Sequence, residues 1–293
     1  MTAIPMDGKA LAATIESRLK EDSARMIQAG VQPTLATILV GNDPASKVYV
    51  SSKHKAAARV GISSRSLTLP EETSESELRS LISTLNADRN VNGILLQLPL
   101  PGHLDEMRMI ESIEPGKDVD GLTTTNAGRL VYGQTDMIPC TPRGIMEILH
   151  HYRIPIGSSR AVIINRSTLV GKPLYNLLLH EDATVTVCHS KSKDLASLTR
   201  EADILVTAVG RRPQFVVTAD MVKEGAVVVD VAMNRVDGKL LGDVEYGEVS
   251  QKASHVTPVP GGVGPMTVVM LMQNTLLAAE KQNRLLVPSV PQP

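Results

Sequence analysis

The chain has 293 residues, two cysteines and a formal net charge of −1, so it is long enough for one large domain or two ordinary ones. Near neutrality argues against a nucleic-acid binder, which would usually carry a basic patch, and the absence of any run of about 18 apolar residues argues against a membrane span. Two cysteines make no disulfide framework and the N-terminus lacks a secretory signal, so we expect a reduced, cytoplasmic setting.

The first part of the chain alternates helical and extended patterns. Apolar residues recur at helical spacing from 11 to 19, and Gly30 can end that helix. Ser46 is a plausible N-cap of a second helix, which Gly61 stops. We expect strands at 34–40, 65–69 and 91–96 and a further helix at 74–85. Such alternation is typical of an α/β unit.

After Cys140 the alternation becomes regular. We expect strands at 161–164, 184–188, 204–209 and 226–231, and helices near 145–149 and at 171–180, 194–202 and 267–280. Near-continuous apolar strands between helices indicate a parallel sheet covered on both faces. Such a sheet binds nucleotides at the carboxyl ends of its strands. The proline-containing tail, residues 287–293, is expected to be extended or disordered.

Tyr49 and Lys53 are four residues apart, so on a helix they share one face. Ala57 continues that face, which suggests that it is at least partly buried. A lysine in such a place can act in proton transfer. The plainer alternative is a surface lysine whose stem lies beside a packed tyrosine.

Polar residues also break two apolar segments further along the chain. Gln97 interrupts a run that otherwise predicts a buried strand, and a buried amide must find partners. It could bond the lysine or a ligand, or it could be a satisfied polar residue of the core. Asp118 and Asp120 flank Val119, so in an extended segment only one of them faces a binding site. The alternative is a solvated acidic turn.

Residues 165–173 follow an expected strand and precede an expected helix, which is where a phosphate-binding turn belongs. The turn is not a Gly-x-Gly-x-x-Gly fingerprint, but Arg166 and Ser167 can donate hydrogen bonds to phosphate. The next strand ends at His189 and Ser190, where an acidic residue would normally hold a ribose hydroxyl. Hydroxyls and bases there favour a 2′-phosphate, unless the segment is an ordinary polar loop.

The glycine-rich segment 260–265 can bring its backbone close to a ligand, because glycine places no side chain in the way. The alternative is a tight linker between domains. The histidines show no metal-ligand spacing with cysteines or carboxylates, so no metal site is expected.

Taken in order, these segments resemble one family, the bifunctional methylenetetrahydrofolate dehydrogenases and methenyltetrahydrofolate cyclohydrolases. The matching segments are 49–53, 93–101, 117–130, 139–142, 166–173, 187–190 and 257–267. The resemblance implies NADP-dependent oxidation of methylene-tetrahydrofolate to methenyl-tetrahydrofolate, followed by hydrolysis to formyl-tetrahydrofolate in one-carbon metabolism. It also implies a homodimer that binds tetrahydrofolate derivatives and no metal.

The family resemblance carries an expected fold and site. It implies two α/β lobes with a cleft between them: a folate-binding lobe at 1–138 plus 267–293, and a Rossmann-like, doubly wound NADP-binding domain at 139–266. The implied catalytic residues are Tyr49, Lys53 and Gln97; the substrate-binding residues are Leu98, Asp120, Pro260, Gly261 and Gly264; and the cofactor-binding residues are Asn165, Arg166, Ser167, Ser190 and Met233.

Two positions depart from the family pattern, which generally has glycine where Asn165 and Ala232 stand. Asn tolerates a left-handed backbone better than most residues, so we expect the turn at Asn165 to survive. The added methyl of Ala232 could crowd the cofactor. One alternative is therefore a folate-binding homologue with weakened or lost dehydrogenase activity. Another is a two-lobed NADP-dependent dehydrogenase that acts on a hydroxy or amino acid.

Overall fold

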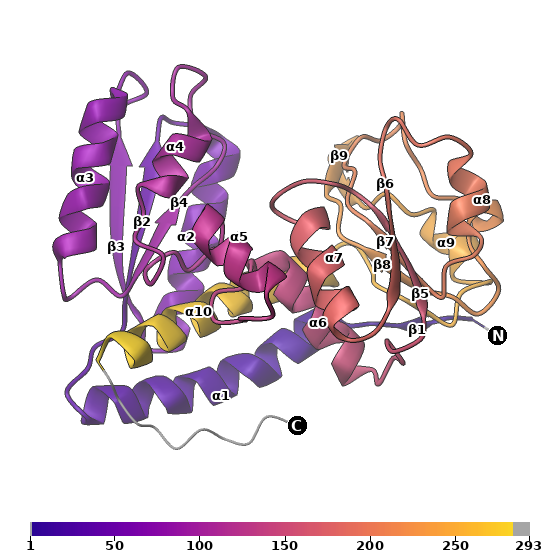
Figure 1. Ribbon diagram of the computed structural model, residues 1–293, viewed down its shortest axis with the longest axis horizontal. Helices are drawn as coiled ribbons and strands as arrows, with labels where there is room; N and C mark the ends of the chain where they lie inside the picture. Colours follow the sequence, from indigo (N-terminus) through magenta and orange to yellow (C-terminus); the bar gives the residue numbers. More distant parts are fainter. Residues whose placement is uncertain (1, 284–293) are drawn as a thin grey trace. The chain divides into compact units, whose positions relative to one another are not determined.

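The computed structural model describes residues 2–283, and the described chain divides into two compact units (Figure 1). Unit 1 combines the chain up to Ala13 with Pro139–Thr267, and unit 2 combines Thr14–Ile138 with the chain from Val268 onward. The expected disorder of residues 287–293 lies outside the described residues. No helix within residues 2–283 has the length and apolar character needed to cross a membrane.

The first residues differ from expectation, because the sequence places them in the folate-binding lobe whereas the structure groups them with unit 1. The cause is strand pairing. Ile4 lies opposite His255 and Pro5 opposite Val256 in a parallel ladder, so the N-terminal strand adds to the sheet of unit 1. Sequence periodicity does not detect a strand of two residues.

Unit 1 is built on a parallel sheet that, within residues 2–283, has six strands in the order β1-β11-β8-β7-β5-β6. Its strands are β1 Ile4–Pro5, β5 Arg160–Ile164, β6 Thr184–Cys188, β7 Ile204–Thr207, β8 Val227–Asp230 and β11 His255–Val256. The chain runs outward from β5 to β6 and then continues on the other side of β5 with β7. The predicted doubly wound sheet is therefore confirmed, and its switch point lies between β5 and β7, where such sheets bind ligands.

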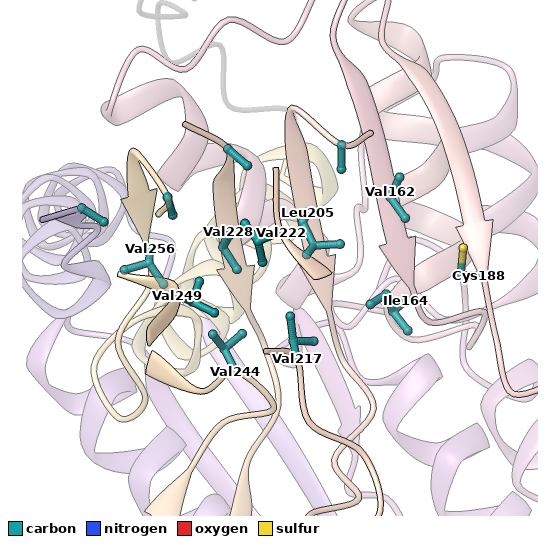
Figure 2. Packing of buried hydrophobic residues seen from close by; sticks show 14 residues of the cluster. Val162, Ile164, Cys188, Leu205, Val217, Val222, Val228, Val244, Val249 and Val256 are labelled. Atoms are coloured by element: carbon teal, nitrogen blue, oxygen red, sulfur yellow. The ribbon is translucent and has the colours of Figure 1, made fainter. Parts of the chain in front are cut away.

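Alternate side chains of these strands fill the core of unit 1 (Figure 2). Val162 and Ile164 of β5 point to the same face as Leu205 of β7 and Val228 of β8, and this set is buried. The chain after the sheet strands covers this face with further valines, namely Val217, Val222, Val244 and Val249. An aliphatic core is what a chain with one Phe and no Trp must use.

Helices and a small hairpin complete unit 1. They are α6 Cys140–His151, α7 Gly171–His180, α8 Leu195–Thr199, the 3₁₀ turn η1 Ala219–Met221, α9 Tyr246–Val249, and the antiparallel strands β9 Asn234–Val236 and β10 Lys239–Leu241. Helix α7 and strand β6 have the predicted bounds. Strand β7 stops at Thr207, short of the predicted end at Val209, because the N–H groups of Val209 and Gly210 bond a side chain instead of a neighbouring strand.

Unit 2 has a parallel sheet with three strands in the described part of the chain, in the order β3-β2-β4. The strands are β2 Thr34–Val40, β3 Ser63–Leu69 and β4 Gly93–Leu96, and the helices are α2 Pro44–Arg59, α3 Glu75–Ala87, α4 Glu106–Glu111 and α5 Thr124–Val131. Two further helices, α1 Gly8–Gln28 and α10 Val263–Gln282, belong to unit 1 up to Ala13 and Thr267 and to unit 2 beyond them. Leu78 and Ile82 of α3 pack against Ile38 and Leu96 of the sheet. The later residues of α10 return to unit 2, as the resemblance implies.

Helix starts in unit 2 follow the capping rules, with one correction. Ser74 caps α3 in a capping box with Glu77, in agreement with the predicted start. The prediction of Ser46 as the N-cap of α2 is wrong, because the cap is Asp43, whose carboxylate accepts the N–H of Ser46 at 2.7 Å. Pro44 occupies the first helical turn, where its missing N–H costs nothing.

The turn after β5 is closed by the side chain of Asn165. Its Nδ2 donates to the Ala208 carbonyl at 2.6 Å, and its Oδ1 accepts from the N–H groups of Ser167 at 2.8 Å and Gly171 at 3.0 Å. Among the described non-glycine residues with positive φ, Asn165 does not occur. The turn therefore survives through hydrogen bonds and not, as expected, through a left-handed backbone.

We predict that Asn165→Gly lowers the unfolding free energy of unit 1 by about 1.5–4 kcal/mol, since it deletes these hydrogen bonds and adds backbone freedom. Asn165→Asp is the matched variant, because it keeps the accepting oxygen and loses only the donor to Ala208; it should fall between the two. Urea unfolding of the three proteins measures the difference. A glycine variant as stable as the parent would show that the side chain does not hold the turn.

Candidate active site

Helix α2 presents Tyr49 and Lys53 on one face of unit 2. The Tyr49 side chain is 41% exposed, Lys53 is half-buried, and Ala57 one turn further is fully buried. The predicted partly buried face is confirmed. Along this helix face the side chains become more exposed from Ala57 through Lys53 to Tyr49. A ligand can therefore reach Tyr49 and Lys53 while the helix stays packed at Ala57.

Gln97 leaves the end of β4 and meets Lys53. The Lys53 Nζ donates to Gln97 Oε1 at 3.0 Å, and Gln97 Nε2 donates to the Leu98 carbonyl at 2.6 Å. The second bond fixes which end of the amide faces the lysine, because the opposite orientation would turn an NH₂ group towards an ammonium. Of the two readings left open by the sequence, the structure supports the one in which the amide holds the lysine.

The surroundings of the histidine next to Lys53 disfavour its charged form. Burial lowers the pKa of His54, and the neighbouring Lys53 lowers it further. Its Nε2 is buried, with no hydrogen-bond partner among the described residues.

Asp118 and Asp120 separate into a buried and a partly exposed carboxylate, as their alternation predicts. Asp118 is 1% exposed and accepts hydrogen bonds from the Thr123 N–H at 2.8 Å and from Asn126 Nδ2 at 2.9 Å. Asp120 is only half-buried. Asp118 thus fixes the backbone, and Asp120 is the carboxylate left accessible to a ligand.

The segment that carries both aspartates is also held by Lys117. The buried Lys117 Nζ donates to the carbonyls of Leu85, Asn86 and Asp88, where α3 ends, at 3.0, 2.8 and 2.8 Å. A cation is favoured at the negative end of a helix dipole. Sequence reasoning did not single out this lysine, since an ordinary surface lysine would give the same pattern.

In unit 1, the glycine-rich loop approaches its neighbours through backbone. Gly261 has a φ of +112°, and its carbonyl accepts the Lys9 N–H at 2.9 Å. A Cβ on Gly8 would lie 2.0 Å from the Gly262 carbonyl oxygen. Pro260 and Gly264 are exposed, and a Cβ on Gly264 would lie 4.0 Å from Met233 Sδ. The structure thus brings a residue expected at the folate next to one expected at the cofactor.

The phosphate-binding candidates lie at adjoining strand ends. Because Ile164 pairs with Cys188 in register, the segments that begin at Asn165 and His189 leave the same edge of the sheet. Arg166 and Ser190 are both exposed there. The first carboxylate after β6 is Asp194, which caps α8 by accepting the Ser197 N–H. Exposed donors without a competing acid fit a nucleotide that carries an extra phosphate on its ribose.

The protein accommodates Asn165 and Ala232, the two departures from the family pattern, with hydrogen bonds and burial. Ala232 is buried, and its N–H donates to Asp230 Oδ1 at 3.1 Å, so its methyl group is covered by the protein and does not crowd the surface at Met233. Ser167 takes part in the turn, since its Oγ accepts the Val170 N–H at 3.1 Å. Within residues 2–283 no group of His, Cys, Asp or Glu has an arrangement that could hold a metal ion.

Two buried carboxylates were missed by sequence reasoning. Asp230 and Asp243 lie below the loops that follow β7 and β8, and burial together with the neighbouring charge of Asp243 raises the pKa of Asp230 to about 6. The only sequence signal for them is an aspartate at the end of an apolar strand and a Gly-Asp pair after a hairpin.

Comparisons with known proteins agree with this geometry. The model of the tetrahydrofolate dehydrogenase/cyclohydrolase catalytic domain matches residues 6–120, and that of the NAD(P)-binding domain matches residues 139–283. The "Bifunctional protein FolD" of Cenarchaeum symbiosum (strain A) is 56% identical over 274 residues, which cover 94% of this chain and 97% of that protein.

Solved structures are similar over nearly the full chain. The bifunctional methylenetetrahydrofolate dehydrogenase/cyclohydrolase FolD of Campylobacter jejuni has a TM-score of 0.93 at 48% identity, covering 97% of this chain and 100% of that one. The Trypanosoma brucei enzyme, complexed with NADP cofactor and inhibitor, has a TM-score of 0.92 at 36% identity, with coverage of 97% and 100%. The chain belongs to the tetrahydrofolate dehydrogenase/cyclohydrolase family.

Proposed function

We propose that Lys53, Gln97, Tyr49 and Asp120 carry the chemistry of a bifunctional enzyme. The enzyme oxidises methylene-tetrahydrofolate to methenyl-tetrahydrofolate with NADP and hydrolyses the product to formyl-tetrahydrofolate, two steps of one-carbon metabolism. The observation that carries the residue assignment is the hydrogen bond of 3.0 Å from Lys53 Nζ to Gln97 Oε1, because it fixes a proton-exchanging group on an accessible face.

Lys53 has the role of moving protons in the hydrolysis. Water adds to the methenyl carbon and loses a proton, and opening of the five-membered ring requires a proton on the leaving nitrogen. Gln97 accepts one N–H of Lys53, and the other hydrogen-bonding positions of Nζ serve water and substrate. The lowered pKa of His54 disfavours a second positive charge beside it.

Asp120 and Tyr49 bind the substrate ring. A carboxylate accepts hydrogen bonds from the amino and ring N–H groups of a pteridine, and Asp120 is the more exposed member of the acidic pair, since it is only half-buried. The exposed Tyr49 phenol offers a flat apolar ring with a polar tip next to Lys53. Leu98 follows Gln97 at the end of β4. The family resemblance assigns Pro260, Gly261 and Gly264 to the substrate as well.

Residues at the carboxyl edge of the unit 1 sheet hold the cofactor. When bound, NADP accepts the hydride that leaves the methylene bridge. Asn165 and Ser167 shape the turn after β5, while Arg166 and Ser190 donate to the 2′-phosphate from adjoining strand ends. Met233, beside Gly264, lies on the nicotinamide side of the site.

We propose further that Thr14–Ile138 with the end of α10 form the folate-binding domain, and that Pro139–Thr267 with the chain up to Ala13 form the NADP-binding domain. The chain works as a homodimer in the cytoplasm. The support is the family resemblance, together with two buried cysteines, Cys140 and Cys188, that form no disulfide and so suit a reducing compartment.

Lys53→Met is expected to lower the hydrolysis of supplied methenyl-tetrahydrofolate by about a hundred- to ten-thousandfold, the usual cost of losing a positioned acid or base. Lys55→Met is the control, because Lys55 is an exposed lysine two residues along the same helix. The decay of methenyl absorbance measures both. Near-normal hydrolysis by the Lys53 variant would remove this lysine from the mechanism.

Asp120→Ala should weaken folate binding and lower both activities together, since an anchor of the pteridine serves both reactions. The loss corresponds to roughly 1.5–3 kcal/mol, the value of a hydrogen bond to a charged group. Titration of a folate analogue against parent and variant provides the measurement. If affinity is unchanged, Asp120 does not bind the pteridine.

NADP should be preferred over NAD, and Arg166→Ala should reduce that preference without disturbing the other residues of the site. The reason is that a guanidinium grips phosphate with two parallel hydrogen bonds. Arg160→Ala is the control, because Arg160 is an exposed arginine at the opposite end of β5. The readout is the ratio of kcat/KM for the two cofactors; a ratio untouched by Arg166→Ala excludes Arg166 as the phosphate reader.

A further inference from the structure

A fully buried carboxylate joins the loops that leave the carboxyl edge of the unit 1 sheet. Asp243 is 0% exposed. Its Oδ2 accepts from Thr207 Oγ1 at 2.8 Å and from the Val209 N–H at 2.7 Å, and its Oδ1 accepts from the Gly210 N–H at 3.0 Å and from Asn234 Nδ2 at 3.3 Å. One side chain therefore holds the end of β7, the loop after it, and the segment after β8.

The position of Asp243 is itself fixed by Asp230 at the end of β8. The Asp230 carboxylate accepts the N–H groups of Asp243 at 3.0 Å and Val244 at 2.8 Å, as well as that of Ala232. A Cβ on Gly242 would lie 1.9 Å from Asp230 Oδ2, so only glycine allows this approach. The two aspartates thus form a buried support below the β7 and β8 loops.

Arg212 and Asn165 extend this support to both sides. Arg212 donates from Nε to the Gly242 carbonyl at 2.7 Å, and its own N–H bonds Asn234 Oδ1 at 2.9 Å. Asn165 bonds the Ala208 carbonyl across the switch point between β5 and β7. The loops after β5, β7 and β8 are therefore connected by hydrogen bonds that run along the edge where the cofactor binds.

We propose that Asp243 is a positioning residue of the NADP site, which fixes the β7 and β8 loops in the arrangement that the cofactor requires. This inference deepens the function proposed above and rests on it. Asp243 is fully buried, so it acts through Val209, Gly210 and Asn234, which it holds. Asn234 follows Met233, the residue assigned to the nicotinamide side.

The charge of the carboxylate is what makes it suitable. Each of its oxygens meets hydrogen-bond donors, and an ionised carboxylate is an acceptor on both sides. An asparagine at this position has the same size, but its NH₂ group would face donors on one side. Asp243→Asn therefore releases either the Thr207 and Val209 donors or the Gly210 and Asn234 donors, without creating a cavity.

A matched control stands at the other end of the same strand. Asp203 precedes β7 and accepts the Arg160 N–H at 2.8 Å and a hydrogen bond from Lys223. It lies at the amino edge of the sheet, away from the carboxyl edge at which cofactors bind. Asp203→Asn thus removes a structural carboxylate of unit 1 without touching the loops that Asp243 holds.

The experiment compares the parent with Asp243→Asn and Asp203→Asn by calorimetric titration of NADP, by urea unfolding and by hydrolysis of methenyl-tetrahydrofolate without NADP. We expect the NADP Kd of Asp243→Asn to rise by about ten- to a hundredfold. We expect Asp203→Asn to bind NADP like the parent, whatever its stability. The NADP-free hydrolysis rate of Asp243→Asn should change far less than its Kd.

Thr207→Val is the second variant, because it removes a single O–H donor to Asp243 and keeps the backbone donors; its Kd should rise by about threefold. It keeps the test decisive if Asp243→Asn does not fold. Folded variants with the parent Kd, or equal losses in Asp203→Asn, would overturn the positioning role. A parent that does not bind NADP would instead overturn the proposed function, so the two failures are distinct.

Discussion

The structure depends on a constraint that parallel sheets impose on their loops. Every strand of the unit 1 sheet ends at the same edge, and the N–H groups beyond the strand ends have no neighbouring strand to bond. Buried or half-buried side chains supply the missing acceptors, as Asn165, Asp230 and Asp243 do. Unit 2 uses Asp118 as such an acceptor, and it uses the Lys117 side chain for the opposite need, since Lys117 donates to carbonyl oxygens at the end of α3. These polar groups determine where the loops go.

The side chains assigned to chemistry are separate from those that hold the loops. Lys53, Asp120 and Arg166 are at least partly exposed, whereas the groups that fix the adjoining backbone are buried and fully occupied. A buried network of this kind resists rearrangement, because breaking one bond leaves a desolvated group unpaired. The reactive groups can therefore exchange ligands while their backbone stays in place, which is the condition for precise positioning.

Elements with strong local signals could be predicted from the sequence, and elements fixed by distant partners could not. Helix α7 and strand β6 have the predicted bounds because glycine, turn residues and alternation mark their ends. Helix α5 and the β9–β10 hairpin were missed, since both are short and depend on Asp118 and Asp243 for their starts. The Lys53–Gln97 pair was foreseen as one of two interpretations. The Gly-Asp pair at Asp243 does not reveal its role, because its partners come from β7 and the loop after it.

The pairing of β1 with β11 has a consequence for how unit 1 is made. The strand that completes the edge of its sheet is synthesised first, and its partner at His255 is synthesised near the end of the chain. The ribosome must therefore release most of the protein before this edge can close. A fragment of residues 139–283, the span of the matched NAD(P)-binding domain, would leave β11 as a bare edge strand that can pair with other chains. Unit 1 is built from two separate segments of the chain, so an excised version of it must include the N-terminal strand.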